Sequence, residues 1–285
     1  MKTTNFLKKT VAAIAAFSLV LGISSCSNND GKKDSTVGKE TEKTIKLSIG
    51  ATPVPHAEIL LVVKDILARE NIELSIVEYT DYVIPNTAVD QGENDANFFQ
   101  HITYLNNFNE ENNTSLVSVA NVHFEPLSIY PGKSKSLADI PDGATIAIPN
   151  DPTNEARSLL LLQQEGFITI KEGKGLTATP QDIIDNPKNL QFKELEAAIV
   201  SQALTEVDFG IINGNYALSA GLTAADSLAC ESVGSEAVTA YVNVIAVKAG
   251  SENRPEIKAL IAAVTSDEVR EFIQSTYGVS VVPVF

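Results

Sequence analysis

From Thr44 onward, segments typical of β-strands alternate with segments typical of α-helices. Residues 45–50 are apolar at every second position, which is the pattern of a strand with one buried face. Residues 56–70 instead repeat apolar side chains three and four positions apart, as an amphipathic helix does, and residues 72–76 alternate again. Because strands joined by helices pair mostly in parallel, we predict an α/β fold with largely parallel, covered sheets.

The alternation divides the chain into two α/β units. One unit precedes residue 129 and a second occupies 129–242. A strand at 241–247, which begins at the end of the second unit, and two helices complete the sequence. We therefore predict two lobes, the first made of 44–128 plus 243–285 and the second of 129–242. Open α/β sheets bind ligands beyond the carboxyl ends of their strands, and clefts between lobes are common pockets, so we expect the ligand cleft between the lobes.

The N-terminus has the pattern of an export signal. A positively charged start is followed by an apolar run at 11–23, which is too short to span a bilayer and ends in small residues. The stretch Ile-Ser-Ser-Cys at 23–26 is similar to the bacterial lipobox, in which the cysteine is acylated and becomes the first residue of the mature protein. We predict a signal peptide at 1–25 and a lipid on Cys26. The alternative is an ordinary signal peptide with an incidental cysteine.

The segment that follows, 26–43, contains almost no apolar residue and is rich in serine, asparagine, glycine and lysine. Such a segment cannot bury enough surface to fold. We therefore predict a flexible, lipid-anchored tether that connects the folded part to a membrane, so that no membrane-spanning helix is needed.

Composition sets two further limits. With Cys26 lipidated, Cys230 has no disulfide partner, and its small neighbours favour a buried position. The net charge of −15 argues against a nucleic-acid partner, because binding to phosphates needs a basic face. The fold is therefore expected to depend on its core alone, and its ligand is expected to be something other than nucleic acid.

A polar segment at 149–157 follows one predicted strand and opens a predicted helix. Asn150 or Asp151 can cap this helix, whose free first-turn amides and dipole favour an anion. Asn154 and Arg157 lie three positions apart on one helical face, and a guanidinium can bind a carboxylate through two hydrogen bonds. The alternative is a well-capped helix whose arginine forms a surface ion pair.

Further candidates lie at or near predicted strands. Asn213 directly follows a predicted strand, where asparagine often forms a turn. Asn243 lies inside a predicted strand, where asparagine is less expected, so its position is the more unusual of the two. Packed core aromatics are the commoner reason for an aromatic cluster. Four ring-bearing residues could nevertheless line a ligand cavity at a strand end: Tyr82, Phe99, His101 and Tyr104.

Taken together, these segments make the chain similar to a known family. It resembles the NlpA-type methionine-binding lipoproteins, the receptors of methionine ABC importers, over essentially all of 47–285. Val54 and Ala156 stand where the family usually has glycine, but neither departure removes a polar group. The similar segments are 50–59, 82–86, 95–101, 123–126, 149–157, 212–217 and 241–243.

The resemblance implies a two-lobed, type II periplasmic-binding fold that closes on L-methionine and possibly D-methionine. It implies that Arg157, aided by Asn154, binds the ligand's carboxylate. Asn213 and Asn243 would hold the α-amino and carboxylate groups, with Glu125 as a further candidate for the ammonium. Because sulfur packs favourably against aromatic edges, the thioether side chain would lie among four rings. These are the rings of Tyr82, Phe99, His101 and Tyr104.

The resemblance also implies a monomeric, extracytoplasmic receptor of the bacterial cell envelope that passes its ligand to the membrane subunits of an ABC importer. It implies no enzymatic activity, no cofactor and no bound metal. We expect Arg157 and Asn243 to be wet in an open cleft, so that neither contributes much to the stability of the unliganded protein.

Other functions fit parts of the sequence. His56, His101 and His123 are widely spaced but could meet in the fold as a zinc site, which would indicate a metal-binding receptor or a zinc-dependent enzyme. The usual motifs of hydrolases and phosphate-binding enzymes are absent from the sequence, which weakens the enzyme interpretation. A surface adhesin that keeps the receptor fold is a third interpretation, against which the intact Arg157 and Asn243 argue.

Replacing Cys26 by alanine removes the thiol that the lipid would join. We expect Cys26→Ala to move the protein from the detergent-dependent membrane fraction to the soluble fraction, because the hydrocarbon chains provide the membrane affinity. Fractionation with and without detergent measures this. Equal detergent dependence of the variant and the original chain would contradict the lipid anchor.

Overall fold

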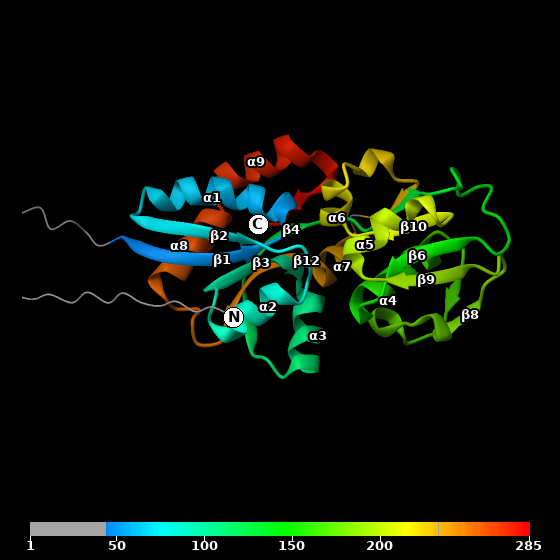
Figure 1. The fold of residues 1–285 in the computed structure, drawn as a ribbon, viewed down its shortest axis with the longest axis horizontal. Coiled ribbons are helices and arrows are strands. Elements are labelled where there is room, and N and C mark those ends of the chain that lie inside the picture. The colour runs from blue at the N-terminus through cyan, green and yellow to red at the C-terminus, as the bar shows by residue number, and fades with distance from the viewer. Residues whose placement is uncertain (1–43, 233) are drawn as a thin grey trace, which may run out of the picture. The chain divides into compact units, whose positions relative to one another are not determined.

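The computed structural model describes residues 44–232 and 234–285. The predicted signal peptide at 1–25, the lipid site Cys26 and the tether at 26–43 lie outside the described residues. In the described part, helices and strands form two α/β lobes, each built around its own sheet (Figure 1). No helix there is long and apolar enough to cross a membrane.

The first lobe contains a six-stranded sheet in the order β13-β4-β12-β3-β1-β2. Its strands are β1 (Ile45–Ala51), β2 (Ile72–Glu78), β3 (Ala96–His101), β4 (Leu116–Phe124), β12 (Val242–Lys248) and β13 (Val282–Pro283). β1 pairs in parallel with β2 and β3, whereas β12 is antiparallel to β3 and β4. The prediction of parallel pairing is therefore right for β2-β1-β3. It is wrong for β12, because that strand enters the sheet from the second lobe and runs the opposite way, and for β13, which is antiparallel to β4.

Helices cover both faces of this sheet. One face packs against α1 (Glu58–Ala68), α8 (Pro255–Val264) and α9 (Asp267–Tyr277), and the other against α2 (Ile84–Gln91) and α3 (Ile102–Asn112). Successive side chains of β12 enter opposite cores, Val244 one and Ile245 the other, because strand side chains alternate. Burial on two sides explains why β12 is a nearly continuous apolar run.

The second lobe contains a five-stranded sheet in the order β11-β5-β10-β6-β9. Its strands are β5 (Ser128–Pro131), β6 (Thr145–Pro149), β9 (Gln191–Leu195), β10 (Phe209–Ile212) and β11 (Ala229–Cys230). β10, β6 and β9 are parallel. The short β5 is antiparallel to β10, and β11 is antiparallel to β5; the sequence pattern did not predict these two strands. The prediction that Cys230 is buried is wrong, because it lies in the two-residue edge strand β11 and is exposed.

Two further cores surround this second sheet. Leu159 and Leu162 of α4 (Pro152–Gln164) pack against one face, and Val200 of α5 (Ala197–Val200) and Ala217 of α6 (Gly214–Ser219) against the other. The remaining elements are α7 (Ser235–Ala240), the ribbon β7 (Thr169–Ile170) and β8 (Ile183–Asp185), and the short turns η1 (Pro53–Ala57), η2 (Gly175–Thr177), η3 (Pro180–Asp182), η4 (Ser201–Thr205), η5 (Ala224–Asp226) and η6 (Gly278–Ser280).

The described chain passes between the two sheets twice, once between β4 and β5 and once between β11 and β12. The last strands and helices then return to the first sheet (Figure 1). This is the two-lobed α/β architecture that the sequence predicts. The boundaries at 44–128, 129–242 and 243–285 stay a prediction.

Gly132 follows β5 where another stretch of backbone passes close by. A Cβ here would lie 2.3 Å from the carbonyl oxygen of Val207 and 2.6 Å from that of Leu204. Because backbone cannot move aside as a side chain can, Gly132→Ala should lower the free energy of unfolding by about 2 kcal/mol, measured by denaturant titration. Gly234→Ala is the control, since the nearest atom to its Cβ would be 3.7 Å away. Equal losses in both variants would contradict the argument.

Candidate ligand-binding site

One cavity between the lobes brings together all nine side chains predicted for a ligand site. Its walls include the carboxyl end of β3 and the segments that follow β6 and β10, the places where open α/β sheets bind ligands. Three lining residues, Gln100, Gly214 and Asn215, were not predicted. The nine predicted residues are Tyr82, Phe99, His101, Tyr104, Glu125, Asn154, Arg157, Asn213 and Asn243.

The cavity is narrow. It holds about 320 Å³ of space free of protein atoms, which is at the small end of the range of ligand pockets. The cavity is therefore a slot rather than an open chamber. A slot of this size suits a slender side chain, because the extra atoms of a bulky one would meet the walls.

His101, at the end of β3, is held in one tautomer. Its Nδ1 accepts a hydrogen bond of 3.0 Å from the backbone N–H of Tyr104, in the first turn of α3. Since a backbone N–H only donates, Nδ1 carries no proton, and Nε2 donates to Oδ1 of Asn154 at 3.1 Å. Burial, together with the positive charge of Arg157, lowers the pKa of His101 to about 3. The ring is therefore neutral at physiological pH.

Asn154 connects this histidine to the second lobe. Its Nδ2 donates to Asp151, the N-cap of α4, at 2.9 Å, and its Oδ1 accepts from Nδ2 of Asn213 at 2.8 Å. With Nδ2 turned toward Asn154 in this way, the other polar atom of the Asn213 side chain is Oδ1, which is buried without a partner among the described residues. An unpaired buried acceptor is costly unless a donor reaches it. Asn213 thus presents an acceptor to the cavity.

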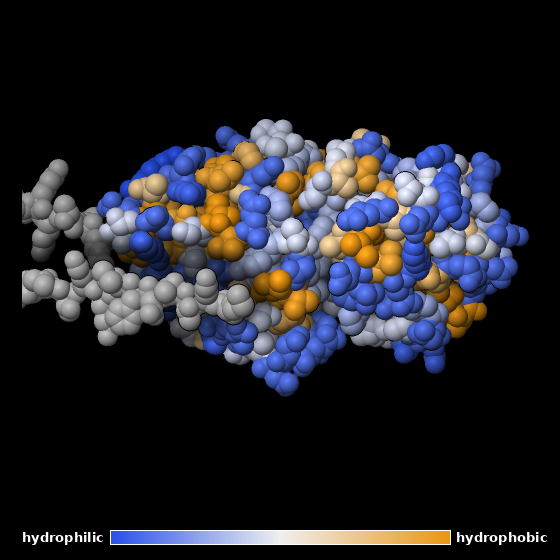
Figure 2. Space-filling model, in the orientation of Figure 1, coloured by the Kyte–Doolittle hydropathy of each residue, from blue (hydrophilic) through white to orange (hydrophobic). Residues whose placement is uncertain are grey.

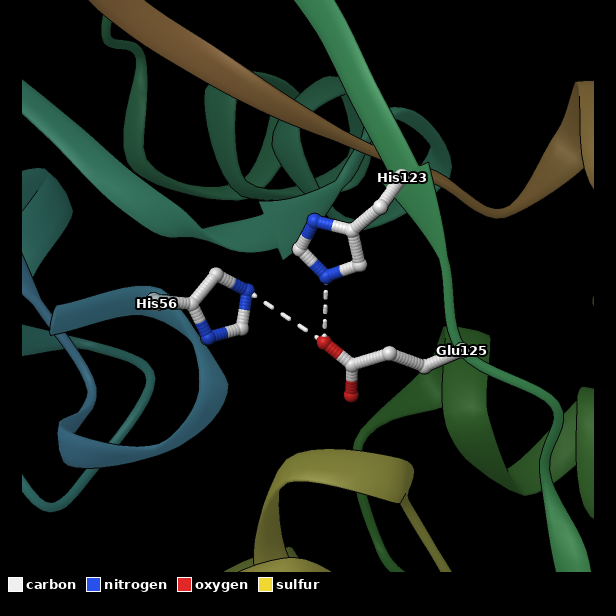
Figure 3. A group of neighbouring side chains, drawn as sticks. All are labelled: His56, His123 and Glu125. Carbon is white, nitrogen blue, oxygen red and sulfur yellow. Dashed lines mark hydrogen bonds and ion pairs between the residues drawn. The ribbon is translucent and has the colours of Figure 1, made fainter. Parts of the chain in front are cut away.

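Glu125 is held by two histidines of the first lobe (Figure 3). Its Oε1 lies 2.6 Å from Nε2 of His123 and 3.4 Å from Nε2 of His56. Burial alone would raise the pKa of Glu125, but the hydrogen bond from His123 and the positive charge of Arg157 are among the interactions that outweigh it and lower the pKa. The carboxylate is therefore ionised inside the cavity.

His56 in turn fixes the orientation of Asn243. Burial lowers the pKa of His56 to about 4, so its ring is neutral. Its Nε2 faces the Oδ1 of Asn243 at 3.1 Å and must donate, while Nδ1 accepts from the hydroxyl of Thr52 at 2.7 Å. Asn243 therefore presents its Nδ2, a hydrogen-bond donor, to the cavity. Asn213 presents an acceptor, so the two asparagines are opposite in hydrogen-bonding polarity.

The side chains of His56, His123 and Glu125 are also of the types that bind metal ions. Zinc bonds of about 2.0–2.2 Å in tetrahedral geometry place two ligand atoms roughly 3.3 Å apart. Nε2 of His123 and Oε1 of Glu125 are only 2.6 Å apart, which is a hydrogen-bond distance. His101 bonds to Asn154 instead. The three-histidine zinc site considered from the sequence is therefore not formed.

Arg157 is buried in an ion pair that the sequence did not reveal. Its Nε and Nη2 donate to the two carboxylate oxygens of Glu231 at 2.8 and 2.6 Å, and Nη2 also donates to the backbone oxygen of Glu125 at 2.8 Å. The expectation of a wet Arg157 and Asn243 is wrong, because the closed lobes bury both. The alternative of a surface ion pair is wrong for the same reason. Nη1 is the guanidinium nitrogen left for a ligand.

An aromatic group forms another part of the cavity wall. The ring of Tyr82, before α2, lies 5.7 Å from that of Phe99, 5.6 Å from Tyr104 and 4.9 Å from Tyr216, measured between centroids. The hydroxyl of Tyr82 donates across the lobes to Oδ1 of Asn215 at 2.6 Å. Tyr216 and Asn215 received no role from the sequence, although they come directly after the predicted Asn213 and Gly214.

The buried neutral His101 makes the fold sensitive to acid. Between about pH 6.5 and pH 3 the unfolded chain binds a proton on this ring that the folded chain does not, so stability falls as the pH falls. From about pH 7 to about pH 5 this ring should contribute a loss of about 2 kcal/mol. Denaturant titrations at both values should therefore show a smaller loss for His101→Gln than for the original chain. The same pH dependence in both would contradict the lowered pKa of His101.

Known proteins are similar to this chain over most of its length. The family model described as NlpA lipoprotein matches residues 47–285. The membrane lipoprotein TpN32 of Treponema pallidum is 41% identical over 273 residues, which cover 94% of this chain and 96% of that protein. The D-methionine-binding lipoprotein MetQ of Escherichia coli is 35% identical over 276 residues, covering 96% and 97%.

Solved structures extend the comparison to the fold. The structure of a nutrient-binding protein from Burkholderia cenocepacia bound to methionine is 41% identical and superimposes with a TM-score of 0.80. The match covers 84% of this chain and 100% of that one. Sequence and architecture thus agree over nearly the whole of the described part. The chain belongs to the NlpA lipoprotein family.

Proposed function

We propose that this chain is an extracytoplasmic receptor that captures methionine, in the L- or the D-form, for an ABC importer. A relative named for D-methionine binding aligns with almost the whole chain, and a solved relative is described as bound to methionine. The cavity supports this proposal independently, through the polarity of its walls and through its narrow shape.

The opposite polarity of Asn213 and Asn243 is the observation that carries the proposal. Oδ1 of Asn213 and the carboxylate of Glu125 can accept from an ammonium group, whereas Nδ2 of Asn243 and Nη1 of Arg157 can donate to a carboxylate. A buried zwitterion needs partners of both kinds. Asn154 contributes by holding Asn213 in place.

The shape of the cavity supports a slender, sulfur-containing side chain. The slot is lined by the rings of Tyr82, Phe99 and Tyr104, and sulfur packs favourably against aromatic rings. The neutral ring of His101 adds no charge to this wall. L- and D-methionine present the same ammonium, carboxylate and thioether groups, so both are proposed ligands.

The proposal includes a location and partners. A lipid on Cys26 and a tether at 26–43 would anchor the receptor to a membrane of the cell envelope, with its folded part outside the cytoplasm, and the membrane subunits of the importer would receive the ligand. We propose a monomer, since on the face that Figure 2 shows the apolar residues form separate patches among hydrophilic ones. The proposal involves no catalysis, no cofactor and no nucleic acid.

Calorimetric titration with L-methionine tests the two donors. Arg157→Ala should weaken binding roughly 30-fold to several-thousand-fold, because the ligand's carboxylate loses a charged partner in a desolvated site. Asn243→Ala should weaken it less, about 5- to 150-fold, since only a neutral hydrogen bond is lost. Arg157→Ala should also lower the melting temperature of the unliganded protein, because Glu231 is left buried without its partner.

Arg254→Ala is the matched control. Arg254 also forms an ion pair, with Asp95 at 2.8 Å, but it is partly exposed and does not line the cavity. Its removal should leave the affinity for methionine within about twofold of the original. Failure of the unaltered protein to bind either enantiomer would reject the proposed function, and equal affinity in the Arg157 variant would reject the assigned site.

A further inference from the structure

Asn215 has a buried donor that no residue in the described chain satisfies. It lies in the first turn of α6, is 3% exposed and lines the cavity. Its Oδ1 accepts the hydroxyl hydrogen of Tyr82 at 2.6 Å, and its Nδ2 is buried without a partner. Burial raises the pKa of Tyr82 well above its usual value, so this hydroxyl stays a donor and keeps Oδ1 turned toward it. Nδ2 is thereby left for whatever fills the cavity.

This donor lies at the aromatic part of the cavity. Nδ2 shares a planar amide with the oxygen that contacts Tyr82, and the Tyr82 ring is surrounded by Phe99, Tyr104 and Tyr216. The two charged groups that suit the ends of an amino acid are held by neighbours other than Tyr82. Arg157, which suits a carboxylate, is paired with Glu231, and Glu125, which suits an ammonium, contacts two histidines. A ligand whose charged groups reach those partners has its side chain among the rings.

We propose that Asn215 is a specificity-determining residue, whose Nδ2 donates a hydrogen bond to the side-chain sulfur of a thioether amino acid. The inference rests on the proposed function, since it takes methionine as the ligand. A thioether sulfur is a weak acceptor, whereas a methylene group in the same place accepts nothing and leaves the buried donor unpaired. A site with such a donor rejects an analogue that lacks the acceptor. Asn215 thus lets the slot distinguish sulfur from a methylene group of similar size.

Titration with L-methionine and L-norleucine, which replaces the sulfur by a methylene group, measures this discrimination. The unaltered protein should bind methionine about tenfold more tightly than norleucine. Asn215→Leu keeps a similar volume but removes the donor, so the ratio of the two affinities should fall to about one, mainly through weaker methionine binding. A melting curve of each variant establishes that it is folded.

Two further variants separate the donor from its surroundings. Tyr82→Phe removes the hydroxyl that holds Oδ1 of Asn215, so the amide can turn and the preference for methionine should weaken, although Nδ2 is still present. Asn215→Asp keeps an acceptor for Tyr82 and removes the donor, so it should lose the preference as Asn215→Leu does. If Asn215→Leu does not fold, the preference measured for Asn215→Asp tests the role of the donor.

Two results would overturn the inference while leaving the proposed function intact. These are equal binding of both ligands by the unaltered protein, or a preference for methionine retained in both Asn215 variants. If the unaltered, folded protein binds neither ligand, the proposed function is rejected and this inference with it.

Discussion

The buried ion pair between Arg157 and Glu231 is the interaction on which the site depends. It joins α4 to the segment between β11 and β12, through which the chain returns to the first lobe. Glu231 also accepts a hydrogen bond from the backbone N–H of Leu127, in the segment between β4 and β5 that leads to the second lobe. The guanidinium lies 4.1 Å from the centre of the Tyr241 ring. A buried charge without its partner is strongly destabilising, so Arg157 belongs both to the architecture and to the ligand site.

The polarity of the cavity is set by residues behind its walls. Asp151 and His101 orient Asn154, which orients Asn213, while Thr52 and His56 orient Asn243 in the same stepwise way. Each step holds because a donor faces an acceptor and the histidine rings are neutral. The groups that face the ligand are therefore preorganised, and less ordering is needed when it binds.

Much of the fold and most of the site could be predicted from sequence, for identifiable reasons. Long periodic segments such as α1 carry a strong local signal, and polar residues such as Asn213 stand where strands end. Glu231 could not be found, because its partner is 74 residues away and no local pattern links them. The burial of Arg157 and the antiparallel direction of β12 were also missed, since both follow from how the lobes come together.

Native mass spectrometry of the protein, purified without added ligand and then mixed with L-methionine, tests the central claim most directly. A cavity of fixed donors and acceptors, suited to one zwitterion with a slender side chain, should give a complex that carries a single methionine. The complex should persist when norleucine is added in equal amount. A folded protein that takes up no methionine, or that holds a metal ion in its place, would contradict the account.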